Sequence, residues 1–323
     1  MENDGKDIIF EDFHGPIVDK YLKSNQSVTS SGFCKAWPSG CVLPVGYVEE
    51  AERIRRLGVR EDDVWVVTYP KCGTTWTQEM TWLLVNNLDY DAAKATSIVR
   101  RSPFMEFGSL TKGSKSDVPD TVSIVENLKP PRVIKSHLPL QLLPYQLWTV
   151  KPKIIYVARE AKDVAVSYYH HHRLVTAYTG TIQDFVEAFV EGSVMYGSLW
   201  DHILEFWKIR DEPYILFNTY EEMKKDLPGV VQRTAKFLNR SLDSRQLEEL
   251  CEHLSFESMK KNPSTNLEEQ LSRESRPKIE GKVEPFMRKG QVGNWKAELT
   301  MEDAEKIDKW TEEKLKGSDY VLQ

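Results

Sequence analysis

The residues best suited to chemistry stand at the ends of short apolar stretches. One stretch leads into Tyr69-Pro70-Lys71-Cys72-Gly73-Thr74-Thr75-Trp76, and a second ends in Lys135-Ser136-His137. Glycine lets a backbone approach an anion closely, and threonines at a helix start add hydroxyl donors to unpaired N–H groups. Lys71 adds a positive charge with enough reach to touch a leaving-group oxygen. The first motif therefore predicts a phosphate-binding turn between a strand and a helix.

The order of lysine and glycine in this turn separates it from a triphosphate loop. The Walker motif GxxxxGK[ST] places its lysine after the last glycine, whereas Lys71 precedes Gly73. A plain strand-to-helix turn with a helix cap is the alternative for Gly-Thr-Thr alone. Lys71 and Trp76 together favour anion binding over that alternative. The lysine order disfavours an ATP-dependent kinase.

Lys135 and His137 are two positions apart, so on a strand their side chains share one face. Histidine can take a proton near neutral pH, and a neighbouring lysine can stabilise negative charge. The pair therefore predicts a general base beside a cation. A structural histidine next to a solvated lysine is the alternative, and it fits the pair equally well.

A second anion site is predicted around Arg159. This arginine ends another apolar stretch, and Ser167 follows it in the next predicted helix. Arginine binds phosphate through a bidentate fork, and the serine hydroxyl can reach the same group. Arg288, Lys289 and Gly290 form a basic turn near the C-terminus that would add two cations. A solvated charged turn is the alternative for that segment.

The run His170-His171-His172 suggests a metal site, but its spacing argues against one. Successive helical residues point in different directions, so three adjacent histidines cannot share one ion. No metal is expected. Asp163, near the start of the same helix, suits the positive end of the helix dipole and is interpreted as structural.

Strand and helix patterns alternate along the chain. The strand candidates span residues 64–69, 132–137, 153–158 and 214–217. The helix candidates span residues 47–57, 74–87, 162–174, 182–191, 198–210, 230–238 and 244–253. This alternation predicts an α/β fold with a central, mostly parallel sheet and helices on both faces. Ligands of such sheets bind at the carboxyl ends of the strands, where the candidate residues lie.

The chain has 323 residues, a net charge of -6 and four cysteines without a zinc spacing. We expect one globular domain, in which residues 1–44 form an irregular segment ahead of residues 45–323. The acidic balance argues against nucleic acid as a partner. Neither a secretory signal nor an apolar run of ~18 residues is visible, so no membrane span and a cytoplasmic, reduced protein are expected.

Four of these motifs, in this order, resemble those of the cytosolic sulfotransferases. Residues 69–76 resemble that family's 5′-phosphosulfate loop, with Cys72 where serine is common, and residues 134–139 resemble its catalytic strand. Residues 156–170 resemble its 3′-phosphate motif, and residues 286–296 resemble its closing loop. The resemblance implies a P-loop-nucleotide-kinase-like fold.

The resemblance also implies 3′-phosphoadenosine 5′-phosphosulfate as sulfuryl donor and a small, mostly apolar phenol, sterol, retinoid alcohol or amine as acceptor. In-line attack would proceed without a metal, and the implied catalytic residues are His137 as general base, Lys71, Lys135 and Ser167. The implied nucleotide-binding residues are Lys71, Cys72, Gly73, Thr74, Thr75, Trp76, Arg159, Ser167, Tyr220, Phe256, Met259, Arg288, Lys289 and Gly290. The implied acceptor-binding residues are Phe104, Phe107, Lys135 and His137.

Three further positions bear on this resemblance. Leu254 stands where the family usually has threonine, which puts one hydrogen bond beside the adenine in question. The segment Lys296–Glu305 resembles the family's dimerisation motif, so a homodimer is expected; an ordinary helix capped by Thr300 is the alternative. Residues 87–94 are similar to insect members of the family, including a retinol dehydratase, which sulfonates an allylic alcohol and then lets sulfate leave.

A catalytically silent nucleotide- or ligand-binding protein on the same fold is a further alternative. Lys71, Lys135 and His137 occur together, which argues against silence. The sequence therefore favours an enzyme.

Overall fold

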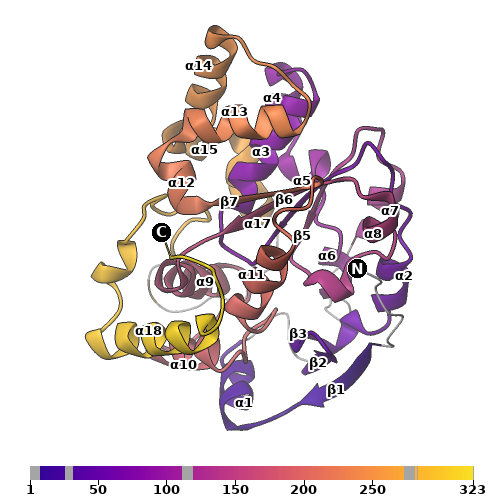
Figure 1. The fold of residues 1–323 in the computed structure, drawn as a ribbon. Helices are drawn as coiled ribbons and strands as arrows, with labels where there is room; N and C mark the ends of the chain where they lie inside the picture. The colour runs from indigo at the N-terminus through magenta and orange to yellow at the C-terminus, as the bar shows by residue number, and fades with distance from the viewer. Residues whose placement is uncertain (1–7, 26–31, 111–118, 273–280, 282, 323) are drawn as a thin grey trace.

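A computed structural model describes residues 8–25, 32–110, 119–272, 281 and 283–322. Its centre is a parallel sheet of β4 (Val64–Thr68), β5 (Val133–Ser136), β6 (Lys153–Ala158) and β7 (Ile215–Thr219). The strand order is β5-β4-β6-β7, and every neighbouring pair is parallel (Figure 1). The predicted α/β fold is confirmed.

Helices cover both faces of the sheet because successive strand residues point to opposite sides. In β4, Val64 and Val66 belong to one apolar cluster, whereas Trp65 and Val67 belong to another. The Val66 cluster includes side chains of α3 (Thr74–Val85), α13 (Leu227–Phe237) and α14 (Ser244–His253). The Trp65 cluster includes side chains of α9 (Ala161–Val175), α10 (Ile182–Val190), α11 (Leu199–Lys208) and α18 (Met301–Leu315). Figure 1 shows these two groups on opposite sides of the sheet.

The expectation of an irregular segment over residues 1–44 is wrong for its described part. Strands β1 (Ile9–Phe13), β2 (Phe33–Trp37) and β3 (Cys41–Pro44) form an antiparallel sheet, and α1 (Pro16–Lys23) lies between β1 and β2. The strands are short and β3 is buried on both faces, so the alternation of a half-exposed strand is missing from the sequence. Residues of this sheet join the Trp65 cluster. That the chain is one domain stays a prediction.

The other expected elements are present with shifted ends. In place of one helix over residues 47–57, the structure has two short elements, η1 (Val45–Tyr47) and α2 (Ala51–Arg55). Thr300 caps α18 by accepting a hydrogen bond from the Asp303 N–H. The remaining helices are α4 (Tyr90–Ala95), α5 (Ile98–Arg101), α6 (Phe107–Leu110), α7 (Thr121–Glu126), η2 (Leu140–Leu142), α8 (Leu147–Val150), α12 (Tyr220–Lys225), α15 (Phe256–Lys261), α16 (Pro263–Asn266), α17 (Glu268–Ser272) and η3 (Asn294–Ala297).

The strand order gathers the candidate residues at one edge of the sheet. The turn with Lys71 follows β4, His137 follows β5, Arg159 follows β6 and Tyr220 follows β7. All four strands are parallel, so these positions lie at the same carboxyl edge, on both sides of the point where the connections change direction. The topology therefore selects this edge as the candidate site.

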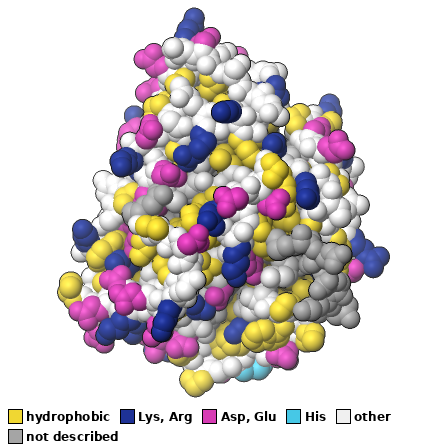
Figure 2. Space-filling view, in the orientation of Figure 1, with side chains coloured by type: hydrophobic (Ala, Val, Ile, Leu, Met, Phe, Trp, Pro, Cys, Tyr) yellow, Lys and Arg dark blue, Asp and Glu magenta, His cyan; other side chains and the backbone are white. Residues whose placement is uncertain are grey.

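Figure 2 shows Lys and Arg side chains interspersed with Asp and Glu on the face presented there. Across the described ranges, none of the helices has the length and apolar character needed to cross a bilayer.

Candidate active site

The turn after β4 has a backbone that suits a bound anion. Lys71 and Gly73 both have left-handed conformations, with φ of 69° and 102°. A lysine in this region costs of order 1–3 kcal/mol, so the surrounding fold must hold it there. A Cβ on Gly73 would lie 2.9 Å from the Tyr220 ring. No side chain caps the start of α3, which leaves its first N–H groups for a ligand.

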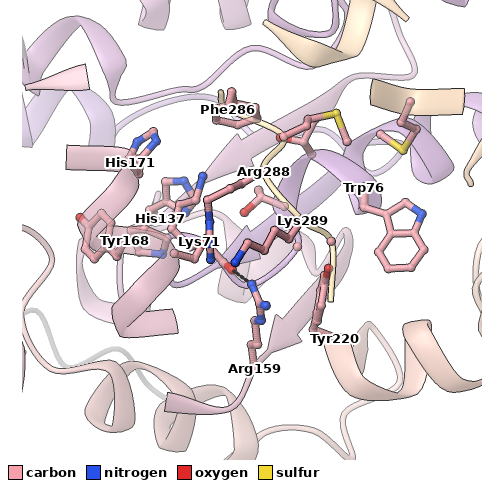
Figure 3. Close-up of a pocket in the computed structure, with 18 of the residues that line it drawn as sticks. Lys71, Trp76, His137, Arg159, Tyr168, His171, Tyr220, Phe286, Arg288 and Lys289 are labelled. Carbon is pink, nitrogen blue, oxygen red and sulfur yellow. Dashed lines mark hydrogen bonds between the residues drawn. The ribbon is translucent and has the colours of Figure 1, made fainter. Parts of the chain in front are cut away.

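A cavity of about 210 Å³ opens at this turn. Figure 3 shows Trp76 and Tyr220 on one side, His137, Tyr168 and His171 on the other, and Lys71, Arg159, Arg288 and Lys289 between them. The sequence-predicted residues that line it are Lys71, Gly73, Thr74, Thr75, Trp76, Phe104, Lys135, His137, Arg159, Ser167, Tyr220, Phe256, Met259, Arg288, Lys289 and Gly290. Leu254 lines it as well. The site residues thus converge from distant parts of the chain.

Two predicted residues, Cys72 and Phe107, do not line the cavity with their side chains. The Cys72 side chain is fully buried in the Trp65 cluster, and its Sγ lies 3.8 Å from the Pro70 carbonyl oxygen. Phe107 packs against Phe104 with ring centroids 6.0 Å apart. Cys72 therefore reaches the site through its backbone alone, and Phe107 supports the aromatic ring that does face the cavity.

The hydrogen bonds of His137 define its tautomer. Its Nδ1 lies 2.7 Å from the Thr68 carbonyl oxygen, which can only accept, so Nδ1 carries the proton. Nε2 then keeps its lone pair and can accept a proton. Burial is the main reason that the pKa of His137 lies well below its usual range, and nearby Lys135 adds to the effect. The imidazole is therefore neutral at neutral pH and ready to act as a base.

Buried polar groups also hold the His137 backbone. Its N–H donates to Glu106 Oε1 at 2.7 Å, and its carbonyl oxygen accepts from His202 Nε2 at 3.0 Å. His202 Nδ1 in turn accepts from the Tyr156 hydroxyl at 2.8 Å. These bonds hold the backbone of His137, and the bond from Nδ1 to the Thr68 carbonyl oxygen holds its ring, before any ligand binds.

Lys71 and Lys135 present their amines to aromatic rings. The Lys71 Nζ lies 4.3 Å from the Phe286 ring centroid, and the Lys135 Nζ lies 4.1 Å from that of Phe104. Desolvation, together with the nearby charges of Lys135 and Arg159, lowers the pKa of Lys71 to about 7. Desolvation also lowers the pKa of Lys135 to about 8, although Glu106 opposes this shift. An anion placed in the cavity would therefore raise the pKa of both amines and favour their charged forms.

Arg159 connects the turn after β4 to the C-terminal loop. Its guanidinium donates to the Lys71 carbonyl oxygen at 3.2 Å, which Figure 3 marks, and to the Gln291 carbonyl oxygen at 3.0 Å. The same group lies over the Tyr220 ring at 4.1 Å. Its Nε is buried without a partner in the described part of the chain. A donor left in this state is suited to an anionic ligand.

Asp163 fastens the C-terminal loop to α9. Its carboxylate accepts hydrogen bonds from the Gly293 N–H at 2.7 Å and from the Trp295 N–H at 3.1 Å. The sequence-based interpretation of Asp163 as structural is confirmed, and its role is more specific than the helix dipole. The loop is thereby held where Arg288 and Lys289 reach the cavity.

Aromatic rings form the other wall. Trp76 and Tyr220 meet edge to face with centroids 5.7 Å apart. A Cβ on Gly290, whose φ is 60°, would lie 2.2 Å from the Phe256 ring, so only glycine fits this approach. This end of the cavity offers flat apolar surfaces next to cations, as a purine with phosphates would require.

The comparisons with known proteins agree with this geometry. Residues 61–319 match the family model described as the sulfotransferase domain. The chain belongs to the sulfotransferase family. It is 38% identical to luciferin sulfotransferase of Photinus pyralis over 98% of this chain and 85% of that relative. It is 39% identical to sulfotransferase 1E1 of Bos taurus over 84% of this chain and 90% of that relative.

Solved structures resemble this sulfotransferase over most of its length. A retinol dehydratase in complex with retinol and PAP superimposes with a TM-score of 0.89 at 31% identity, covering 98% of this chain and 99% of that one. Mouse sulfotransferase SULT7A1 in complex with PAP gives a TM-score of 0.67 at 27% identity, covering 87% of this chain and 93% of that one. The P-loop-like fold expected from the sequence agrees with these neighbours.

Several residues of the sulfotransferase cavity escaped the sequence-based reasoning. Tyr196 meets His137 edge to face at 5.5 Å, and Tyr168, Met195 and Phe286 also line the space. Phe286 is the first residue of segment 286–296, whose resemblance to the family's closing loop is a sequence signal for it. Tyr196 has no local signal, because its backbone N–H is held by the Val42 carbonyl oxygen of the unpredicted N-terminal sheet.

The three adjacent histidines of α9 have three different surroundings. His170 contacts Glu298, His171 lines the cavity, and His172 is buried against the Tyr21 hydroxyl. The prediction that they point apart is confirmed. Within the described ranges, His, Cys, Asp and Glu side chains do not gather in a group of three or more that could hold a metal ion.

Proposed function

We propose that this sulfotransferase transfers a sulfuryl group from 3′-phosphoadenosine 5′-phosphosulfate to the hydroxyl or amine of a small, mostly apolar acceptor. The nucleotide product is adenosine 3′,5′-bisphosphate, the PAP that is bound in the similar structures. The observation that carries the proposal is the neutral, tautomer-defined His137 beside two desolvated lysines. A base next to unneutralised cations suits a reaction in which a proton leaves and negative charge grows.

The residues present fit such a donor at two separate points. The uncapped start of α3 and Lys71 suit the 5′-phosphosulfate. Arg159, Arg288 and Lys289 suit the 3′-phosphate, and Ser167 on α9 adds a hydroxyl from the same wall. Trp76, Tyr220, Phe256 and Met259 line the remaining part of the cavity, where the adenine would lie.

The chain's own residues support in-line transfer. His137 Nε2 takes the proton of the acceptor hydroxyl as the acceptor oxygen attacks sulfur. Lys71 and Lys135 stabilise the charge that grows on the sulfuryl oxygens and on the bridging oxygen. Phe104 and the neighbouring Tyr196 surround the imidazole and favour a flat apolar acceptor. The donor supplies the activated sulfuryl group.

A thermal-shift panel with a transfer assay tests the proposal. A ligand that binds only the native state at 100 times its Kd adds about 2.7 kcal/mol to stability. We expect a large shift with adenosine 3′,5′-bisphosphate, little with ATP, and transfer of labelled sulfate to phenols, sterols or retinoid alcohols. A larger shift with ATP than with the bisphosphate would refute the nucleotide assignment.

Sulfonation followed by elimination is a second candidate. The specific support is the similarity to retinol dehydratase, whose fold matches over nearly the whole chain. His137 and Lys71 would then act first in transfer, and loss of sulfate would follow from the allylic product. Incubation with the donor and retinol distinguishes the two, because only elimination forms anhydroretinol. Accumulation of a stable sulfate ester with no anhydroretinol would exclude this candidate.

We also propose a cytoplasmic homodimer that forms through Lys296–Glu305. Met301 in this segment is 74% exposed, which leaves this apolar side chain available to a second copy. Light scattering on the purified protein and on Met301→Lys tests this. A monomer in both samples would remove the proposal, whereas a dimer that Met301→Lys dissociates supports it.

A further inference from the structure

Glu298 lies against the basic turn in which the 3′-phosphate is expected to bind. Its Oε1 accepts hydrogen bonds from Arg288 Nη1, from Lys289 Nζ at 3.3 Å and from Asn294 Nδ2 at 2.9 Å. Its Oε2 contacts His170 Nε2 of α9 at 2.5 Å. The side chain is 18% exposed. One carboxylate therefore contacts two of the cations proposed to hold the nucleotide.

The surroundings keep this carboxylate ionised. Partial burial acts to raise the pKa of Glu298, but the hydrogen bond with His170 and the charge of Arg288 hold it well below its usual range. In the part of the chain that the structure describes, Glu298 is the acidic residue paired with Arg288 and Lys289. The basic turn thus carries its own negative charge before any nucleotide binds.

We propose that Glu298 is a resident counter-anion that competes with the nucleotide's 3′-phosphate for Arg288 and Lys289. The inference rests on the proposed function, because it requires a 3′-phosphate at this turn. A phosphate that arrives must share or displace N–H donors that the carboxylate already uses, and two anions on the same cations repel one another. Glu298 therefore weakens nucleotide binding by competing for the same cations.

This arrangement has a kinetic consequence. A product with two phosphates among Lys71, Lys135, Arg159, Arg288 and Lys289 would dissociate slowly, and product release limits turnover in many enzymes. A carboxylate that returns to Arg288 and Lys289 as the phosphate leaves lowers the free energy of the nucleotide-free state. Glu298 thereby favours release without touching the reacting atoms.

The test compares two nucleotides that differ only in the 3′-phosphate. Isothermal titration of wild-type protein and Glu298→Gln gives the Kd of adenosine 3′,5′-bisphosphate and of adenosine 5′-monophosphate. We expect the variant to bind the bisphosphate about tenfold more tightly, which is about 1.4 kcal/mol, and the monophosphate with unchanged affinity. Steady-state kinetics should show a lower KM for the donor and a lower kcat.

Two controls accompany the variant. Glu312→Gln removes the same charge from an exposed position on α18, and it should leave both affinities unchanged. The ratio of the two Kd values within one sample does not depend on the folded fraction. Glu298→Ala, which cannot donate or accept, should shift this ratio in the same direction if competition is the cause.

The outcomes separate the inference from the proposed function. Wild-type protein that binds both nucleotides equally has no 3′-phosphate site, and the proposed nucleotide assignment fails with the inference. Wild-type protein that prefers the bisphosphate while Glu298→Gln shows the same or a smaller preference keeps the assignment and overturns the inference. A smaller preference would mean that the carboxylate orients the two cations rather than competes for them.

Discussion

The cations at the two ends of the cavity have different partners. At the proposed reacting end, Lys71 and Lys135 face aromatic rings, form no ion pair with a carboxylate in the described part of the chain, and have lowered pKa values. At the anchoring end, Arg288 and Lys289 share the carboxylate of Glu298. The same kind of side chain is therefore left unneutralised at one end and neutralised at the other.

This difference matches the work that each end has to do. Negative charge that grows only in the transition state is stabilised best by cations that have no competing partner in a desolvated site. The 3′-phosphate does not take part in the proposed reaction, so its binding has to be specific but also reversible. A competing anion such as Glu298 makes the binding more readily reversible. In the proposed mechanism, catalysis and nucleotide binding therefore depend on different cations of one cavity.

The strongest test of this division is His137→Ala, which removes the base and leaves both groups of cations in place. We expect kcat to fall by about 10³–10⁴-fold, because the acceptor hydroxyl then loses its proton acceptor. Affinity for adenosine 3′,5′-bisphosphate should stay within about twofold, since its binding uses other groups. Stopped-flow transfer assays and calorimetry measure the two quantities. A variant that keeps wild-type turnover would remove His137 from its role.

Lys71→Met tests the reacting end directly. The change removes a cation that has no counter-ion, so kcat should fall by about 10²–10³-fold. Methionine keeps much of the apolar length beside Phe286, which makes the comparison one of charge rather than of volume. Arg288→Met is the matched variant at the anchoring end and should mainly raise the Kd of the nucleotide. Equal effects of both variants on kcat would contradict the division.

Nucleotide binding should be accompanied by proton uptake at the lysines of the reacting end. Lys71 has a pKa of about 7 without nucleotide, so at pH 8 most of the protein holds a neutral amine there. An anion placed beside it raises this pKa, and binding should then take up as much as about one proton at Lys71. Calorimetry in buffers of different ionisation enthalpy measures the uptake, to which Lys135 also contributes.

The variants at the two ends should differ in this measurement. Lys71→Met should lower the uptake at pH 8, whereas Glu298→Gln should leave it unchanged because the Glu298 carboxylate is ionised throughout.

The lowered pKa of Lys71 also predicts how the stability of the nucleotide-free protein depends on pH. The folded pKa of Lys71 is below its value in the unfolded chain, so its destabilising contribution is complete below pH 7 and disappears by about pH 10.5. Lys71→Met should therefore stabilise the nucleotide-free protein fully below about pH 7 and progressively less as the pH rises to about 10.5.

The central sheet and the residues at its edge were predictable from sequence for a physical reason. Buried parallel strands are almost continuously apolar, so their ends are visible, and the functional residues follow those ends directly. The resemblance to a known family then supplied roles that spacing alone left open between catalytic and structural readings, as for His137. The short antiparallel strands of residues 9–44 carried no comparable pattern.

Residues that reach the site through tertiary contacts were not predictable. Tyr196 is held next to His137 by the Val42 carbonyl oxygen and by Glu106, which lie far from it in the chain. The contact of Glu298 with Arg288 depends on how Asp163 and His170 fasten the C-terminal loop to α9. Neither pairing follows from local periodicity, because each depends on the assembled fold.

The smallest expected effect belongs to Cys72→Ser, which tests how the turn after β4 binds its anion. The Cys72 side chain is buried and points away from the cavity, so only its backbone is available to the phosphosulfate. Burial raises the pKa of the Cys72 thiol, so the side chain is a neutral thiol at neutral pH and contributes no charge. We expect kcat and the Kd of adenosine 3′,5′-bisphosphate to change by less than about twofold.

A serine at this position introduces a hydroxyl into an apolar cluster, and the nearby Pro70 carbonyl oxygen offers it an acceptor. Thermal unfolding of the variant measures whether that hydrogen bond offsets the cost of burying the hydroxyl. A change in the free energy of nucleotide binding that exceeds the change in the free energy of unfolding would show that the Cys72 side chain, and not the backbone alone, contributes to anion binding. Unchanged affinity would leave Lys71 as the charged side chain that this turn offers to the anion, with the backbone N–H groups as its other donors.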